Sequence, residues 1–188
     1  MIHHRLASLY HHSFRSTVTT ESENTRSRKL RQLSELHYTK ATSFFISQNM
    51  FSHSIRTSLE RAGVLEATPS AGKYKTLLQI LDIILETREV VLKIVSRDKS
   101  EEHEEDEVTE ERKMMETILQ RLQFTLLSIM KLGANTKSKK KSDKKTEQGS
   151  KVVKELYGKT LQCNVKSETF FEDLEKLLKL VVNERNNL

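Results

Sequence analysis

The chain is poor in the residues that make tight turns and cross-links. Its 188 residues include five glycines, one proline (Pro69) and one cysteine (Cys163). An all-β sandwich or barrel of this length needs about fifteen tight turns, which rely on glycine and proline, so the composition excludes that class. A lone cysteine cannot form a disulfide within the chain, and this is typical of proteins from reducing, intracellular compartments.

Long hydrophobic runs are also missing. The longest apolar stretch, residues 77–85, is interrupted by Gln79 and Asp82 and falls far short of the ~20 residues that span a membrane. Charged residues make up 31% of the chain, above the usual ~25%. We therefore expect no membrane segment, and an economical core flanked by solvated stretches.

Apolar residues recur every three or four positions along most of the chain, which is the spacing of amphipathic helices. The stripe over residues 74–95 is the widest, so we expect that helix to be central. The pattern predicts an all-α fold of stacked antiparallel helix hairpins. The expected helices cover residues 1–15, 30–46, 51–67, 74–95, 110–132, 149–163 and 167–185.

Two charged tracts interrupt this helical pattern. Residues 98–111 contain nine acidic side chains, and residues 137–145 contain six lysines and no apolar residue. Such stretches repel themselves and bury little surface, so we expect disordered charged linkers. The predicted organisation is a tetratricopeptide-like helical region at 1–96, an acidic linker at 97–109, and a C-terminal helical region at 110–188 interrupted by a Lys-rich loop at 134–149.

Motifs for catalysis and metal binding are incomplete. Residues 158–160 (Gly-Lys-Thr) match the end of a phosphate-binding loop, but Val153 stands where that motif requires glycine. His4 and His11 are seven residues apart, whereas two helical metal ligands are typically four apart. Cys163 has no evident catalytic partners. We therefore expect no enzyme activity, no cofactor, no bound metal and no small-molecule substrate.

The Lys-rich tract has three interpretations. It is a candidate nuclear-import signal, an inert solubilising linker, or an arm that contacts nucleic acid. Because it lacks arginine and interleaved aromatic residues, it offers nucleic acid only nonspecific charge and is a weak candidate for that role. The candidate import residues are Lys137, Lys139, Lys140, Lys141, Lys144 and Lys145.

The first two predicted helices contain a recognisable pattern of small and aromatic residues. Leu6-Ala7-x-x-Tyr10 resembles the first helix of a tetratricopeptide repeat, and Ser34-x-x-x-Tyr38-x-x-Ala41 resembles the second, with small residues where the two helices cross. The two tyrosines are 28 positions apart, about fifteen more than in a standard repeat. We expect the polar segment 16–27 to form an enlarged loop between the helices.

Segments 4–11, 28–41 and 72–78, followed by 126–132 and the Lys-rich tract, resemble in order the C-terminal region of the erythroid differentiation-related factor 1 family. The resemblance covers most of the chain and implies a nuclear, tetratricopeptide-containing protein that supports transcription in red-cell lineages. It implies partners that bind through helix-hairpin surfaces, and it transfers no catalytic residue. Family members are far longer, so we expect this chain to be a fragment.

Three functional hypotheses follow from these observations. The first is a noncatalytic, nuclear protein-interaction scaffold, which the family resemblance favours. The second is a helical protein that binds nucleic acid nonspecifically through the Lys-rich loop. The third is an assembly subunit of the cytoplasm or mitochondrion, because residues 1–20 contain Arg5 and Arg15 but no acid, as transit peptides do.

Overall fold

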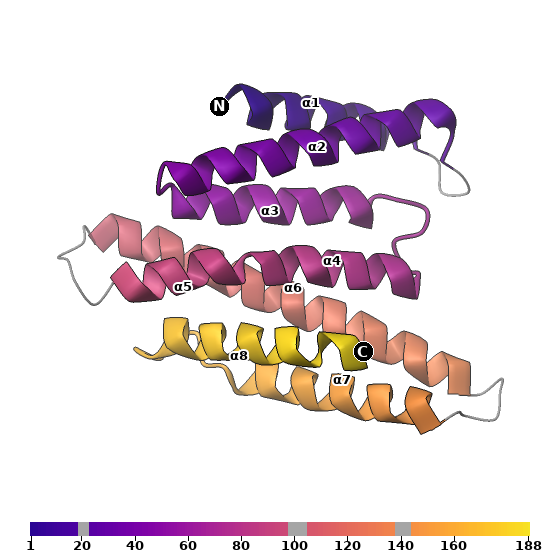
Figure 1. Cartoon of the computed structure of the whole chain (residues 1–188), viewed down its shortest axis with the longest axis vertical. Coiled ribbons are helices and arrows are strands. Elements are labelled where there is room, and N and C mark those ends of the chain that lie inside the picture. Colours follow the sequence, from indigo (N-terminus) through magenta and orange to yellow (C-terminus); the bar gives the residue numbers. More distant parts are fainter. Residues whose placement is uncertain (19–22, 98–104, 138–143) are drawn as a thin grey trace. The chain divides into compact units, whose positions relative to one another are not determined.

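The computed structural model describes residues 1–18, 23–97, 105–137 and 144–188 of the chain. Within those ranges the regular elements are eight α-helices and one short 3-10 helix, so the predicted all-α class is confirmed. Figure 1 shows them in chain order: α1 (Ile2–Thr17), α2 (Thr25–Ser47), α3 (Phe51–Glu66), α4 (Tyr74–Glu86), α5 (Arg88–Arg97), α6 (Glu105–Lys137), α7 (Lys144–Gln162), α8 (Phe170–Glu184) and η1 (Arg185–Asn187).

The chain divides into two compact units, Met1–Val90 and Val91–Leu188. In the first unit, α1, α2, α3 and α4 pack in chain order, each antiparallel to the next (Figure 1). In the second unit, α6 packs against both α7 and α8, and α7 also contacts α8. Each unit is therefore a stack of helix hairpins, as the sequence predicts.

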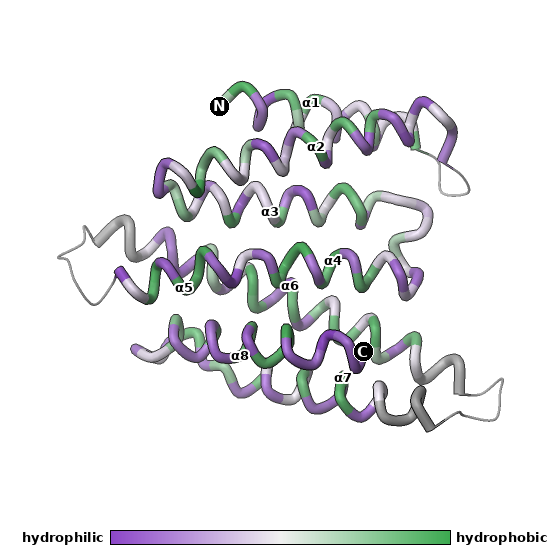
Figure 2. The backbone as a smooth tube through the Cα atoms, viewed as in Figure 1, coloured by the Kyte–Doolittle hydropathy of each residue, from purple (hydrophilic) through white to green (hydrophobic). Residues whose placement is uncertain are grey.

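Each helix buries an apolar side, which explains why these sequences form helices that pack in layers. Figure 2 shows hydrophobic and hydrophilic residues alternating along the tube with the period of a helix. In α4, Leu77, Ile80, Leu81 and Ile84 recur every three or four residues, and none is more than 6% exposed. Burial of such a stripe supplies most of the stability of a short helix, because isolated helices of this length are marginal in water.

The helix expected over residues 74–95 is broken at Thr87, which corrects the prediction of one continuous helix. Thr87 lies between α4 and α5. Its hydroxyl donates to the carbonyl oxygen of Ile84 at 2.6 Å, and its backbone N–H donates to the same oxygen at 3.1 Å. Threonine competes for backbone acceptors in this way. The hydrophobic stripe continues through both helices, so apolar spacing alone does not reveal the break.

The connection between α1 and α2 is shorter than the loop predicted at 16–27, because both helices extend into that segment. Asn24 caps α2: its side-chain oxygen accepts a hydrogen bond from the backbone N–H of Ser27 at 2.8 Å. Phe14 and Ser27 are both fully buried. The additional residues of this hairpin therefore mainly lengthen its two helices and enlarge their contact.

Helices also extend into the stretches that sequence analysis assigned to charged linkers. α6 begins at Glu105 and α7 at Lys144, while residues 98–104 and 138–143 lie outside the described part of the chain. Glu111, from the acidic tract, is buried at 3% exposure. Its carboxylate pairs with the Arg97 guanidinium at 2.5 Å, so an acid that the sequence places in a solvated tract becomes part of the second unit.

Arg112 joins α6 to the segment that connects α7 with α8. Its Nη1 donates to the carbonyl oxygens of Val165 and Ser167, at 2.6 and 3.3 Å. Its guanidinium also lies over the rings of Phe170 and Phe171, 5.9 and 5.4 Å from their centroids. Such cation–π contacts add to the hydrogen bonds. One side chain thus ties the connection to the long helix of this unit.

Candidate functional site

Helices α1 and α2 approach closely at two small residues from the repeat motif. Ala7 of α1 and Ser34 of α2 are both fully buried. The Ser34 hydroxyl donates a hydrogen bond to the Ala7 carbonyl oxygen at 3.0 Å, so a side chain of one helix touches the backbone of the other. A larger residue at either position would push the helices apart.

The other four motif residues lie in the same hairpin. Tyr38 and Ala41 are buried at 2% and 3% exposure, whereas Leu6 and Tyr10 are half-buried. Tyr10 stacks on His37, with ring centroids 5.6 Å apart. Tyr38 forms a buried cluster with Ala7 and with residues of α1 and α3. The structure thus places all six motif residues in α1 and α2 and brings most of them to the inside of the hairpin.

A polar network, absent from the sequence-based site, ties α1 to α2 and α3. His4 Nε2 lies 2.8 Å from a carboxylate oxygen of Glu60 on α3. His11 Nδ1 lies 3.3 Å from the Tyr38 hydroxyl on α2. Burial, together with the Glu60 carboxylate, raises the pKa of Tyr38, so its phenol keeps its proton at neutral pH. The first three helices therefore share hydrogen-bonding side chains in addition to their apolar contact.

Two other histidines, His3 of α1 and His37 of α2, contact each other directly. The Nδ1 atoms of His3 and His37 are 2.9 Å apart, which requires one ring to donate and the other to accept. Burial and the positive charge of His3 and Lys40 lower the pKa of His37. Two neutral rings thus suit this contact, whereas two protonated rings would repel each other.

Metal-binding clusters and the thiol of Cys163 are the remaining candidate sites. In the described part of the chain, no group of three or more His, Cys, Asp or Glu side chains is placed to hold a metal. A cavity of about 280 Å³ lies beside Cys163. Burial and the Asp173 carboxylate raise the pKa of that thiol. Because the thiolate is the nucleophilic form, Cys163 is poorly activated.

None of the helices described is long and apolar enough to cross a membrane.

The candidate import residues fall largely outside what the structure describes. Lys139, Lys140 and Lys141 lie in the segment 138–143. The backbone of Lys137 belongs to the end of α6, and Lys144 and Lys145 open α7. The import interpretation therefore stays a prediction from composition.

The stacked antiparallel hairpins and the small residues at the α1–α2 crossing define a helical-repeat protein of the tetratricopeptide class. A family model described as "Erythroid differentiation-related factor 1-like, TPR repeats" matches residues 1–187, and the chain belongs to this family. The resemblance seen in the sequence is therefore confirmed.

Individual relatives agree with this assignment. The Mus musculus protein named erythroid differentiation-related factor 1 is 30% identical over 202 residues, and the Homo sapiens protein of that name is 28% identical over 202 residues. Each alignment covers 96% of this chain and 16% of the relative, so the chain spans about one sixth of the length of these proteins. No solved structure matches the chain.

We predict that Ala7→Leu destabilises the first unit by about 1–3 kcal/mol, because the added carbons would overpack the crossing where Ser34 bonds to the Ala7 carbonyl. His12→Leu is the matched control, since His12 is exposed on the same helix. Urea unfolding followed by circular dichroism measures the change. Equal stability of the two variants would contradict a close crossing at Ala7.

We also predict that acid weakens the attachment of α1. Burial and the nearby Arg15 lower the pKa of His11, and Glu60 offsets only part of this. The unfolded chain then binds the proton more readily than the folded chain. The neutral ring stabilises the fold above its usual pKa of about 6.5, and this stability is lost as the pH falls from there through the lowered pKa.

The test compares melting temperatures from pH 8 to 5 for the native chain, His11→Gln and His12→Gln. His11→Gln should lose less stability on acidification than the native chain. His12→Gln should behave like the native chain, because His12 is exposed. A native-like pH dependence in His11→Gln would show that His11 does not cause the effect.

Proposed function

We propose that this chain is a noncatalytic protein-interaction scaffold. The observation that supports this most is the α1–α2 hairpin, in which the Ser34 hydroxyl bonds to the Ala7 carbonyl where the tetratricopeptide motif places its small residues. Proteins of this class stack such hairpins into extended surfaces that bind other proteins. The match of the family model over residues 1–187 supports the same role.

We further propose that the protein acts in the nucleus and supports transcription. The six lysines at 137–145 have the composition of an import signal. The relatives are named for erythroid differentiation, and they are about six times longer than this chain. The cytoplasm is the alternative location.

Affinity purification tests the scaffold role. The tagged chain is purified from nuclear extract after nuclease treatment and washed at physiological and at about threefold higher salt. Partners held by apolar helix faces should remain in both washes, since hydrophobic contacts are not screened by salt. Loss of every copurifying protein after nuclease treatment or in the high-salt wash would favour the nucleic-acid-binding alternative. Contacts to phosphates weaken steeply as the salt concentration rises.

The import signal is tested by substitution. Replacing Lys139, Lys140, Lys141, Lys144 and Lys145 by Gln removes five positive charges from the Lys-rich tract. A fluorescent fusion too large to diffuse through nuclear pores should lose nuclear accumulation in this variant.

The control replaces five exposed lysines of the second unit outside the tract (Lys131, Lys154, Lys166, Lys176 and Lys179) by Gln. This control should accumulate in the nucleus like the native chain. Equal nuclear fluorescence of the Lys-tract variant and the native chain would refute the import proposal.

A further inference from the structure

The contact between His3 and His37 joins the two helices of the α1–α2 hairpin. The two residues are 34 positions apart in the sequence, yet their Nδ1 atoms lie 2.9 Å from each other. A neutral imidazole nitrogen is a metal ligand as well as a hydrogen-bonding group. Two such nitrogens that face each other from different helices have the arrangement of a two-histidine chelate.

The helix crossing fixes the positions of both histidines. Ala7 follows His3 by about one turn of α1, and Ser34 precedes His37 by about one turn of α2. The hydrogen bond from Ser34 to the Ala7 carbonyl therefore sets the separation of the two histidine backbones. Tyr10 stacks on His37 with an angle of 24° between the rings, which orients the His37 imidazole. Ligands that rigid helices hold in place lose little freedom when they bind an ion.

The spacing of the two nitrogens favours one coordination geometry. A divalent ion such as zinc holds imidazole nitrogens at about 2.0–2.1 Å. At such bond lengths, adjacent ligands of a square-planar or octahedral ion are about 2.9 Å apart, whereas those of a tetrahedral ion are about 3.3–3.4 Å apart. The 2.9 Å between His3 and His37 matches the first geometry, which copper(II) and nickel(II) adopt with nitrogen and oxygen ligands.

A bound ion would take the place of the hydrogen that the two rings share. In the hydrogen bond, the donating ring carries its proton on Nδ1, and the accepting Nδ1 carries none. For both Nδ1 lone pairs to reach the ion, the donating ring moves its proton to Nε2 through solvent, and the rings turn until the lone pairs converge. No net proton is released, since both rings are neutral before and after the exchange.

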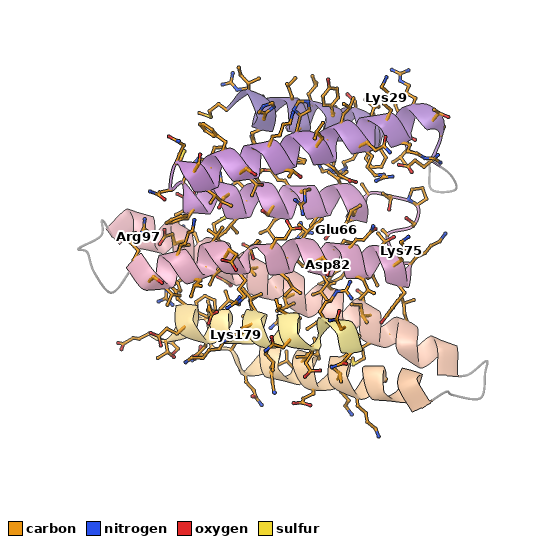
Figure 3. The ribbon with its side chains drawn as sticks, viewed as in Figure 1. Lys29, Glu66, Lys75, Asp82, Arg97 and Lys179 are labelled. Carbon is orange, nitrogen blue, oxygen red and sulfur yellow. The ribbon has the colours of Figure 1, made fainter. Side chains whose placement is uncertain are left out.

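The charges around the pair are compatible with a bound cation. Lys40 repels a cation near His37, but Lys40 is exposed, so salt screens its charge. Lys29 lies about two turns before His37 on α2 and points away from α3 (Figure 3). Burial and the positive charge of His3 and Lys40 lower the pKa of His37, which keeps its imidazole in the neutral form that binds metal. Glu60 adds a negative charge beside His4, the residue next to His3.

We propose that His3 and His37 together bind one divalent transition-metal ion through their Nδ1 atoms, in a square-planar or octahedral site that suits copper(II) or nickel(II), with water at the remaining positions. With two protein ligands rather than the three or four of most protein metal sites, the ion exchanges with solvent. The bound ion stabilises the hairpin, because its ligands meet only when α1 and α2 pack together. This site goes beyond the scaffold role and does not depend on it.

Metal binding is measured on the full 188-residue chain, without a polyhistidine tag and with an acetylated amino terminus. Acetylation is needed because a free terminal amino group two residues before His3 could chelate copper(II) together with that histidine alone. Calorimetric titration at neutral pH gives the affinities for copper(II), nickel(II) and zinc(II). Nickel(II) should bind at least as tightly as zinc(II), because the spacing disfavours a tetrahedral ion. Electron paramagnetic resonance of the complex with one equivalent of copper(II) should show coupling to two imidazole nitrogens.

Variants locate the ion. His3→Gln and His37→Gln should each weaken copper(II) binding at least about tenfold, since loss of even an outer-shell partner of a metal ligand costs about 10–100-fold. His12→Gln and His53→Gln are the matched controls, because both histidines are exposed in the same unit, and these variants should bind like the native chain. Nickel(II) should raise the melting temperature of the native chain and of the controls, but not of the two site variants.

Three results would overturn the proposal: no binding of copper(II) or nickel(II) to the acetylated chain, native affinity in His37→Gln, or a marked preference for zinc(II) over nickel(II). Circular dichroism checks that each variant keeps its helices. If one does not, coupling to two nitrogens in the native chain decides the question, and coupling to one nitrogen refutes the shared site. Affinity purification in the presence of a chelator separates the two proposals, because partners retained there support the scaffold role whether or not the chain binds metal.

Discussion

The close crossing of α1 and α2 is the constraint on which the N-terminal unit depends. Ser34 can bond to the Ala7 carbonyl only because neither position carries a larger side chain, and this contact sets the separation of the two helices. At that separation Tyr38 of α2 is buried against residues of α1 and α3, and its hydroxyl reaches His11. The same spacing leaves room for α3 to approach α1, so that His4 meets Glu60. One small-residue contact thus orders three helices.

Much of this architecture could be predicted from the sequence. Apolar spacing locates the helices, and the short tetratricopeptide pattern identifies the hairpin, because both signals are local. The break at Thr87 could not be predicted in this way, since the residues on either side continue the same hydrophobic stripe. Asn24 is a residue type that often caps helices, and it does cap α2. The start of α2 was still missed, because the residues around Asn24 are polar and resemble a loop.

The polar network of the candidate site escaped prediction for a different reason. Nothing in the sequence near His4 or His11 indicates a partner on another helix, and Glu60 becomes relevant only once α3 packs beside α1. Similarly, Glu111 lies in a tract whose composition is typical of solvated chain, yet Arg97 makes its burial tolerable. Buried polar groups need partners that tertiary packing supplies, so these contacts cannot be inferred from composition alone.

The sequence separation of the contacts made by α1 has a kinetic consequence during protein synthesis. Ser34 follows its partner Ala7 by 27 residues, whereas Glu60 follows His4 by 56. Since chains emerge from the ribosome at about 5–20 residues per second, the α1–α2 hairpin is available to form seconds before α3 appears. During that interval the His4 imidazole lacks its Glu60 partner, whereas His3 and His11 can already meet His37 and Tyr38 on α2. The nascent hairpin is therefore held by its local contacts alone, which makes the first helices a natural point for chaperones to engage the growing chain.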